Sequence, residues 1–136
     1  MGAWSHEPFG NDSACDWAYE LEGKSDFSVI EASLRQVLDN GDEYLDADLA
    51  SEAVAAAEVL AKSREQGTQS DSYTEAVDNW LAQVDGPPPP GLFDLASRAL
   101  ARVLAPDSEL RELWEDSDDF AAWESSITAL QAAVAP

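Results

Sequence analysis

The chain has 136 residues, of which 28 are acidic and 7 are basic, so its formal net charge is −21 at pH 7. This charge excludes binding to nucleic acid through phosphate neutralisation, which depends on Lys and Arg, and attachment to an anionic membrane surface. The length indicates a single domain spanning residues 1–136. Because 45% of the residues are hydrophobic and five are Trp, the composition is that of a folded domain rather than a disordered acidic tail.

Apolar residues recur at helical spacing in the first half of the chain. The first predicted helix is capped by Asn11 or Asp12 and ends at Gly23. A second helix is predicted from residue 25 or 26 to residue 39. The Ala-rich stretch from about residue 47 to residue 62 predicts a helix at the centre of the fold, because small side chains let neighbouring helices approach closely.

The second half of the chain shows the same helical pattern, with one interruption. A helix is predicted around residues 73–84, another between Pro90 and Pro106, a short one over 108–114 and a last one over 118–134. The segment 85–91 contains four consecutive prolines, which favour a stiff polyproline II conformation. Because neither half is long enough for its own core, we interpret this segment as a rigid connection within one domain. We therefore predict an all-α bundle of six or seven helices.

The sequence contains no recognisable enzyme or secretion signal. Cys15 is the only cysteine, so no internal disulfide can form, which is typical of a reducing cytosol. Acidic neighbours of Cys15 raise the pKa of a thiol and disfavour a reactive thiolate. The N-terminus has neither a basic region nor an apolar region of the kind that signal peptides carry. We predict a cytoplasmic protein without a cofactor.

The N-terminal residues form a distinctive pattern. The chain begins Met-Gly-x-Trp and continues with Phe-x-Asn-Asp-x-Ala and with Asp16-Trp17. Together with residues 51–59, residues 106–114 and Ala122-Trp123, this pattern resembles the bacterial family known as domain of unknown function 4259, over nearly the whole chain. The resemblance implies a single compact domain. It supplies no activity and no catalytic residues.

Two interpretations of the N-terminal pattern are open. In the first, its role is packing: Asn11 or Asp12 caps the first helix, and Trp4, Phe9 and Trp17 pack the segment against the core. In the second, His6, Asp12 and Asp16 bind a metal ion and the protein is a metal-assisted hydrolase. Asp12 and Asp16 are four residues apart and so share a helix face. We favour packing, because no metal-binding spacing such as His-Glu-x-x-His occurs.

Two acidic segments are the strongest candidates for function. The candidate partner-binding residues are, in the first segment, Asp39, Asp42, Glu43, Tyr44, Asp46 and Asp48 and, in the second, Glu112, Glu115, Asp116, Asp118 and Asp119. The net charge of −21 exceeds the magnitude of about 2–8 that is enough to keep a small domain soluble. Because excess like charge costs stability through self-repulsion, a basic partner is a common reason for a protein to carry it. Because hot spots favour Trp and Tyr, we expect Tyr44, Trp114 or Trp80 to supply apolar anchors. The sequence does not choose between the two segments.

These observations predict a non-enzymatic acidic protein that binds a basic partner protein. The most specific form of this prediction is a bacterial immunity protein that neutralises a nuclease-type toxin domain, with carboxylates standing in for phosphates. Such a partner would be reached quickly by electrostatic steering. The alternatives are the metal-assisted hydrolase described above and a regulatory or scaffold protein of unknown partner. The oligomeric state stays open.

Overall fold

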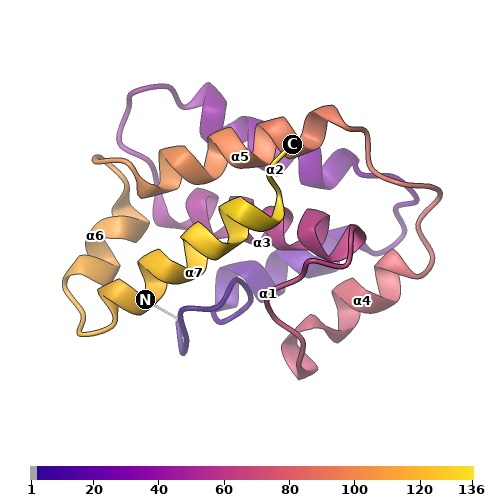
Figure 1. Cartoon of the computed structure of the whole chain (residues 1–136), viewed down its shortest axis with the longest axis horizontal. Helices are drawn as coiled ribbons and strands as arrows, with labels where there is room; N and C mark the ends of the chain where they lie inside the picture. Colours follow the sequence, from indigo (N-terminus) through magenta and orange to yellow (C-terminus); the bar gives the residue numbers. More distant parts are fainter. Residues whose placement is uncertain (1–2) are drawn as a thin grey trace.

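The computed structural model describes residues 3–136 and confirms the all-α fold, with seven α-helices and no strand in that range. The helices are α1 (Asp12–Ala18), α2 (Ser28–Asp39), α3 (Ala47–Ser63), α4 (Glu75–Leu81), α5 (Gly91–Leu104), α6 (Glu109–Glu115) and α7 (Phe120–Ala133), with 3₁₀ turns η1 (Tyr19–Leu21) and η2 (Ser72–Thr74). The helices pack around α3, and α7 crosses the face turned to the viewer in Figure 1.

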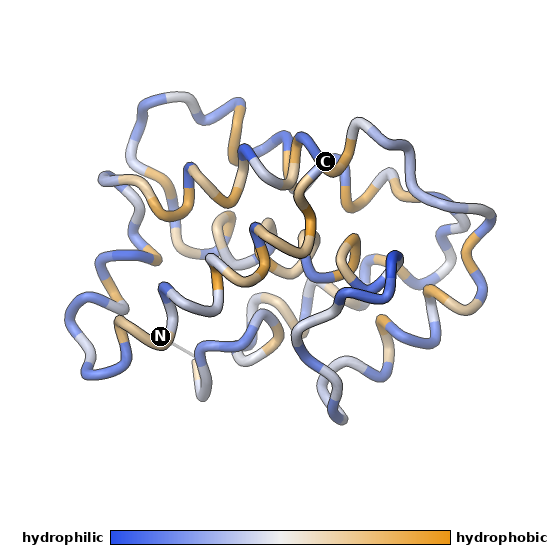
Figure 2. The backbone as a smooth tube through the Cα atoms, viewed as in Figure 1, coloured by the Kyte–Doolittle hydropathy of each residue, from blue (hydrophilic) through white to orange (hydrophobic). Residues whose placement is uncertain are grey.

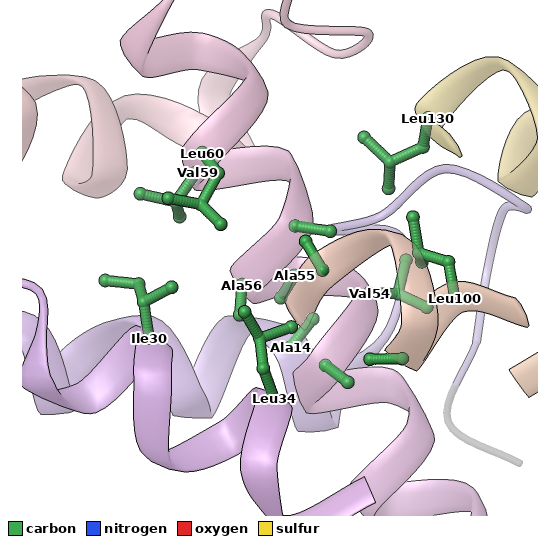
Figure 3. Close-up of a cluster of buried hydrophobic side chains, with 14 of the residues drawn as sticks. Ala14, Ile30, Leu34, Val54, Ala55, Ala56, Val59, Leu60, Leu100 and Leu130 are labelled. Atoms are coloured by element: carbon green, nitrogen blue, oxygen red, sulfur yellow. The ribbon is translucent and has the colours of Figure 1, made fainter. Parts of the chain in front are cut away.

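Helix α3 is the centre of the core, as its alanine content predicts. Every residue from Ala53 to Ala61 is buried, and the helix packs against all the other six helices. Figure 3 shows side chains from α2 (Ile30 and Leu34) and from α5 (Leu100) converging on its small residues. A helix that is apolar on all sides is stable only when other elements surround it. This requirement fixes the arrangement of the remaining helices.

Two helix starts differ from the sequence prediction because an aspartate closes a tight turn just before each. Asp26 Oδ1 accepts hydrogen bonds from the backbone N–H and the hydroxyl of Ser28, so α2 begins at Ser28 and not at residue 25 or 26. Asp71 caps the turn η2, so α4 begins only at Glu75, and it ends at Leu81. The predicted helix over 73–84 is therefore too long at both ends.

The segment between α4 and α5 is held to the connection between α1 and α2. The Asp85 N–H donates to the Ser25 carbonyl at 3.1 Å. Trp80 is buried edge-on against Phe27, with ring centroids 5.3 Å apart, and its indole N–H donates to the Lys24 carbonyl at 3.0 Å. Trp80 is thus part of the core, and its prediction as a surface anchor is wrong.

Glu58 is the one charged residue among the core residues of α3. Its carboxylate is fully buried and accepts hydrogen bonds from the Thr68 N–H and hydroxyl and from the Gln69 N–H, at 2.7–3.1 Å. The Gln69 side-chain oxygen in turn accepts from the Phe9 N–H at 2.8 Å. Glu58 therefore links α3 to the loop after it and, through Gln69, to the N-terminal segment.

Replacing Glu58 by glutamine tests this link. In the Glu58→Gln variant, the side-chain N–H₂ group would face the Thr68 and Gln69 groups that donate to Glu58, so at least one of these hydrogen bonds would be lost. The free energy of unfolding should therefore fall by about 1–3 kcal/mol. Urea denaturation followed by circular dichroism measures the change. The control is Glu22→Gln, which removes the same charge from an exposed position and should shift the value by less than about 0.5 kcal/mol. Equal effects of the two substitutions would contradict the role of Glu58.

The pH dependence of stability provides a second test. Burial raises the pKa of Glu58, against the opposing effect of its hydrogen bonds, and burial together with Glu20 raises the pKa of Glu52. An acid with a raised pKa in the folded state binds its proton more tightly there than in the unfolded chain. The stability it contributes is complete below the unfolded pKa and is lost as the pH rises through the folded pKa.

Stability should therefore increase as the pH falls from about 7.5 to about 4.5, near the pKa of a glutamate in the unfolded chain, and relief of charge repulsion acts in the same direction. Urea midpoints at the two pH values measure this change. Glu52→Gln, which removes one of the two titrating groups, should make the slope shallower. A midpoint that rises toward pH 7.5 would contradict the assignment.

Candidate functional site

The two acidic segments predicted from the sequence lie side by side at one end of the molecule, on the left in Figure 1. The Leu45 N–H donates to the Asp107 carbonyl at 2.8 Å, and the Glu109 N–H donates to the Leu45 carbonyl at 2.9 Å. These bonds form a parallel bridge between Leu45 and Ser108. Residues 39–48 and 107–119 thus form one surface, which we call the acidic surface. Figure 2 shows hydrophilic residues along both segments.

Side chains join the same two segments. The Tyr44 hydroxyl donates to Glu112 Oε1 at 2.6 Å, and the Ala47 N–H donates to Glu109 Oε1 at 2.8 Å. The second bond satisfies a free N–H in the first turn of α3, where a carboxylate is also favoured by the helix dipole. Glu109 therefore acts as a second cap for α3, beside Asp46, its own N-cap residue.

Arg102 on α5 donates hydrogen bonds to backbone carbonyls of both segments. Its guanidinium donates to the carbonyls of Gly41 at 3.1 Å and Glu43 at 2.6 Å in the first segment. It also donates to the carbonyl of Asp107 in the second segment and to that of Pro106 just before it, each at 3.3 Å. The planar fork of an arginine suits several acceptors at once. Sequence reasoning missed this role, because backbone carbonyl acceptors leave no signal in the sequence.

All eleven predicted partner-binding residues are exposed in the structure. Tyr44 is the aromatic residue of the surface, with 52% of its area exposed. Trp114, predicted as an anchor, is buried on the inner face of α6 and is only 7% exposed, so this prediction is wrong. Its spacing from Leu110 places both on the face of α6 that packs inward.

The basic residues of the chain do not neutralise this surface. Within residues 3–136 there are four ion pairs, and only the one between Arg111 and Glu115 lies on the acidic surface. Arg102 binds carbonyls, as does Arg64, whose guanidinium donates to the Ala135 carbonyl at 2.8 Å. Most carboxylates therefore face solvent without a cation from the described chain.

The N-terminal segment combines packing with an exposed aromatic pair. Phe9 and Trp17 are buried, as the packing interpretation predicts. Asn11, and not Asp12, caps α1, accepting from the Ala14 N–H at 2.8 Å. Trp4 does not enter the core: it is 47% exposed and lies against Tyr73, with ring centroids 5.1 Å apart.

The residues proposed for a metal-assisted reaction do not form a metal centre. His6, Asp12 and Asp16 are exposed, and no group of three or more His, Cys, Asp or Glu residues between positions 3 and 136 could hold a metal ion. Burial raises the pKa of the Cys15 thiol, and Asp12 and Asp16 add to this effect.

In the described part of the chain, no helix has the length and apolar character needed to cross a membrane.

Comparison with known proteins identifies the family. A family model described as "Domain of unknown function (DUF4259)" matches residues 2–126, so the chain belongs to this family. No curated protein and no solved structure matches the chain. The family description assigns no activity, so any functional argument depends on the geometry of the acidic surface.

The contact between Tyr44 and Glu112 can be measured by titration. Its hydrogen bond to Glu112 raises the pKa of Tyr44 to about 12, with nearby carboxylates adding to the effect. The chain has three tyrosines. In a titration followed by ultraviolet absorbance, the ionisation step at the highest pH should be absent from the Tyr44→Phe variant. Glu112→Gln should return the Tyr44 pKa toward about 10, whereas Asp116→Asn, on the same surface, should leave it high. An unchanged pKa in Glu112→Gln would contradict the contact.

Proposed function

We propose that this member of the DUF4259 family is a non-enzymatic binding protein that captures a basic partner protein through the acidic surface. Its most specific form is an inhibitor of a nuclease-type toxin domain, with carboxylates occupying the positions that phosphates would take. The observation that carries the proposal is that two acidic segments, about sixty residues apart in sequence, are joined into one surface by backbone hydrogen bonds. A cytoplasmic location is part of this proposal, because such an inhibitor protects the cell that makes the toxin.

The internal contacts of the acidic surface support the proposal. Repelling carboxylates favour separation of the two segments, yet Arg102 and the bond between Tyr44 and Glu112 hold them together. A preorganised surface loses little conformational entropy on binding. A large excess of negative over positive charge also steers a basic partner and accelerates its association. A surface that serves solubility alone requires neither the clamp nor the concentration of charge.

The half-exposed ring of Tyr44 adds an apolar contact to this charged surface. Interface hot spots are enriched in Tyr, Trp and Arg, and they lie where surrounding contacts exclude water. Tyr44, in the first segment, lies where the two segments meet, because its hydroxyl reaches Glu112 in the second. We assign Tyr44 the role of the central contact, with Asp42, Glu43 and Asp46 around it.

Charge-neutralising variants test the proposal against the basic protein that co-purifies with the chain from its native host at low salt. The triple variant Asp42→Asn, Glu43→Gln and Glu112→Gln should slow association by about tenfold or more. Stopped-flow tryptophan fluorescence measures the rate. For the unmodified chain the rate should fall steeply as salt is raised, because salt screens exposed charges.

The matched control changes the net charge equally at the other end of the molecule, around α4. Glu75 begins α4, Asp85 follows it, and Glu22 directly follows η1, which packs against α4; all three side chains are exposed. Glu22→Gln, Glu75→Gln and Asp85→Asn together should leave the rate within about twofold of the unmodified chain, since screening limits long-range effects. A control triple that slows association as much as the first triple would show that net charge, and not the acidic surface, governs binding. A salt-insensitive rate would refute steering.

A further inference from the structure

The four consecutive prolines, Pro87–Pro90, form an exposed segment that the proposed function does not use. This segment, which we call the proline run, lies between α4 and α5, on the right in Figure 1 and at the opposite end of the molecule from the acidic surface. Three of its prolines are exposed, and Pro88 is half-buried. The chain turns at Gly86, where φ is 76°, and enters α5 at Gly91. An apolar segment thus faces solvent on a highly charged protein.

The proline run has the polyproline II conformation. A residue that precedes proline is confined to extended backbone, and the proline ring itself fixes φ near −65°. Pro87, Pro88 and Pro89 all precede a proline, and none of them lies in a helix or strand. Polyproline II has three residues per turn, so the rings of Pro87 and Pro90 share one face, about 9 Å apart. The burial agrees, because both of these prolines are exposed and Pro88 faces inward.

The proline run is fixed at both ends and open between them. The bond from the Asp85 N–H to the Ser25 carbonyl holds the segment before it, and the Leu92 N–H donates to the Pro89 carbonyl at 3.1 Å. The carbonyls of Pro87 and Pro88 accept no hydrogen bond from residues 3–136. A side chain built at Gly86 or at Gly91 would meet no other atom within 4 Å. A partner can therefore reach a segment that is already ordered.

Two arginines lie beside the proline run. Arg35 of α2 and Arg98 of α5 line a hollow together with Pro89. Each uses its Nε to contact an exposed or half-buried carboxylate of its own helix, Glu31 at 2.8 Å and Asp94 at 3.0 Å. Their terminal nitrogens donate to no residue between positions 3 and 136. Because exposed ion pairs of this kind are weak, a carboxylate of a partner can bind the remaining donors.

We propose that the proline run is a docking site for a partner domain whose groove is lined by aromatic side chains and flanked by an acidic side chain. Such grooves recognise polyproline II because it is ordered before binding and presents proline rings at a regular spacing. The rings of Pro87 and Pro90 enter the groove. A tryptophan or tyrosine of the partner donates to a proline carbonyl, and the partner's carboxylate binds Arg98.

This docking site goes beyond the proposed function and does not depend on it. The acidic surface lies at the other end of the molecule, and the charges there are screened over about 8 Å at physiological salt. One chain can therefore hold a basic partner at one end and a domain with an aromatic groove at the other.

The probe for this site is an SH3 domain that selects ligands with an arginine beside two prolines three residues apart. Titration of this domain into the isotope-labelled full chain at about 0.15 M salt, followed by NMR, should give saturable shifts. The shifted signals should be the N–H groups of Gly86 and Gly91 and the Nε–H of Arg98. The N–H of Gly41, on the acidic surface, should not shift. The same SH3 domain with one groove tryptophan replaced by alanine should bind at least tenfold more weakly.

Variants of the full chain identify the contacts. Pro87→Ala and Pro90→Ala should each weaken SH3 binding by about tenfold. Pro106→Ala, which removes an exposed proline outside the run, should leave the affinity unchanged within about twofold. Arg98→Gln should weaken binding by about threefold or more, whereas Asp94→Asn should tighten it, because Asp94 competes for Arg98. NMR signals away from the run report that each variant is folded.

Three results would overturn the proposal: no saturable shift up to about 1 mM SH3 domain, equal binding by the domain without its groove tryptophan, or Pro106→Ala weakening binding as much as Pro87→Ala. Binding that Arg98→Gln weakens but neither variant of the run affects would show a contact of charges alone, and it would overturn the proposal too. None of these variants alters a carboxylate of the acidic surface. Failure of this site therefore leaves the proposed function intact, and a salt-insensitive association rate at the acidic surface leaves this site intact.

Discussion

The burial of α3 is the constraint on which the rest of the structure depends. A helix whose residues from Ala53 to Ala61 are all buried must be covered on every side. The other helices supply that cover, and the small alanine side chains let them pack close to the α3 backbone. Glu58 is the exception inside this helix, and the three groups that donate hydrogen bonds to it come from the following loop instead of another apolar surface.

Covering α3 brings the start of α3 against α6, and this packing joins the two acidic segments. The connection from α2 must reach the start of α3, while α6 follows α5 on the same side of the core. Arg102 and the bridge between Leu45 and Ser108 then fix the two segments in one arrangement. The chain thus uses a scarce basic side chain to hold acidic segments together, and it leaves their carboxylates facing solvent.

In the proposed function, the acidic surface would contribute through two effects. Exposed carboxylates act at long range and affect chiefly the rate of association. The half-exposed ring of Tyr44, held by its hydrogen bond to Glu112, would act at short range and affect chiefly dissociation.

The sequence by itself determined the helical class, the central position of α3 and the acidic residues that reach solvent, because helical periodicity and side-chain size are local properties of the chain. It misplaced the starts of α2 and α4, where Asp26 and Asp71 close turns that periodicity does not detect. It also misjudged Trp80, Trp114 and Trp4, since amphipathic aromatic residues occur both in cores and at surfaces. Only the tertiary structure decided that the two acidic segments form one surface and that Arg102 holds the backbone of both. Both features arise from contacts between residues far apart in the chain, and the backbone carbonyls involved have no residue type that marks them.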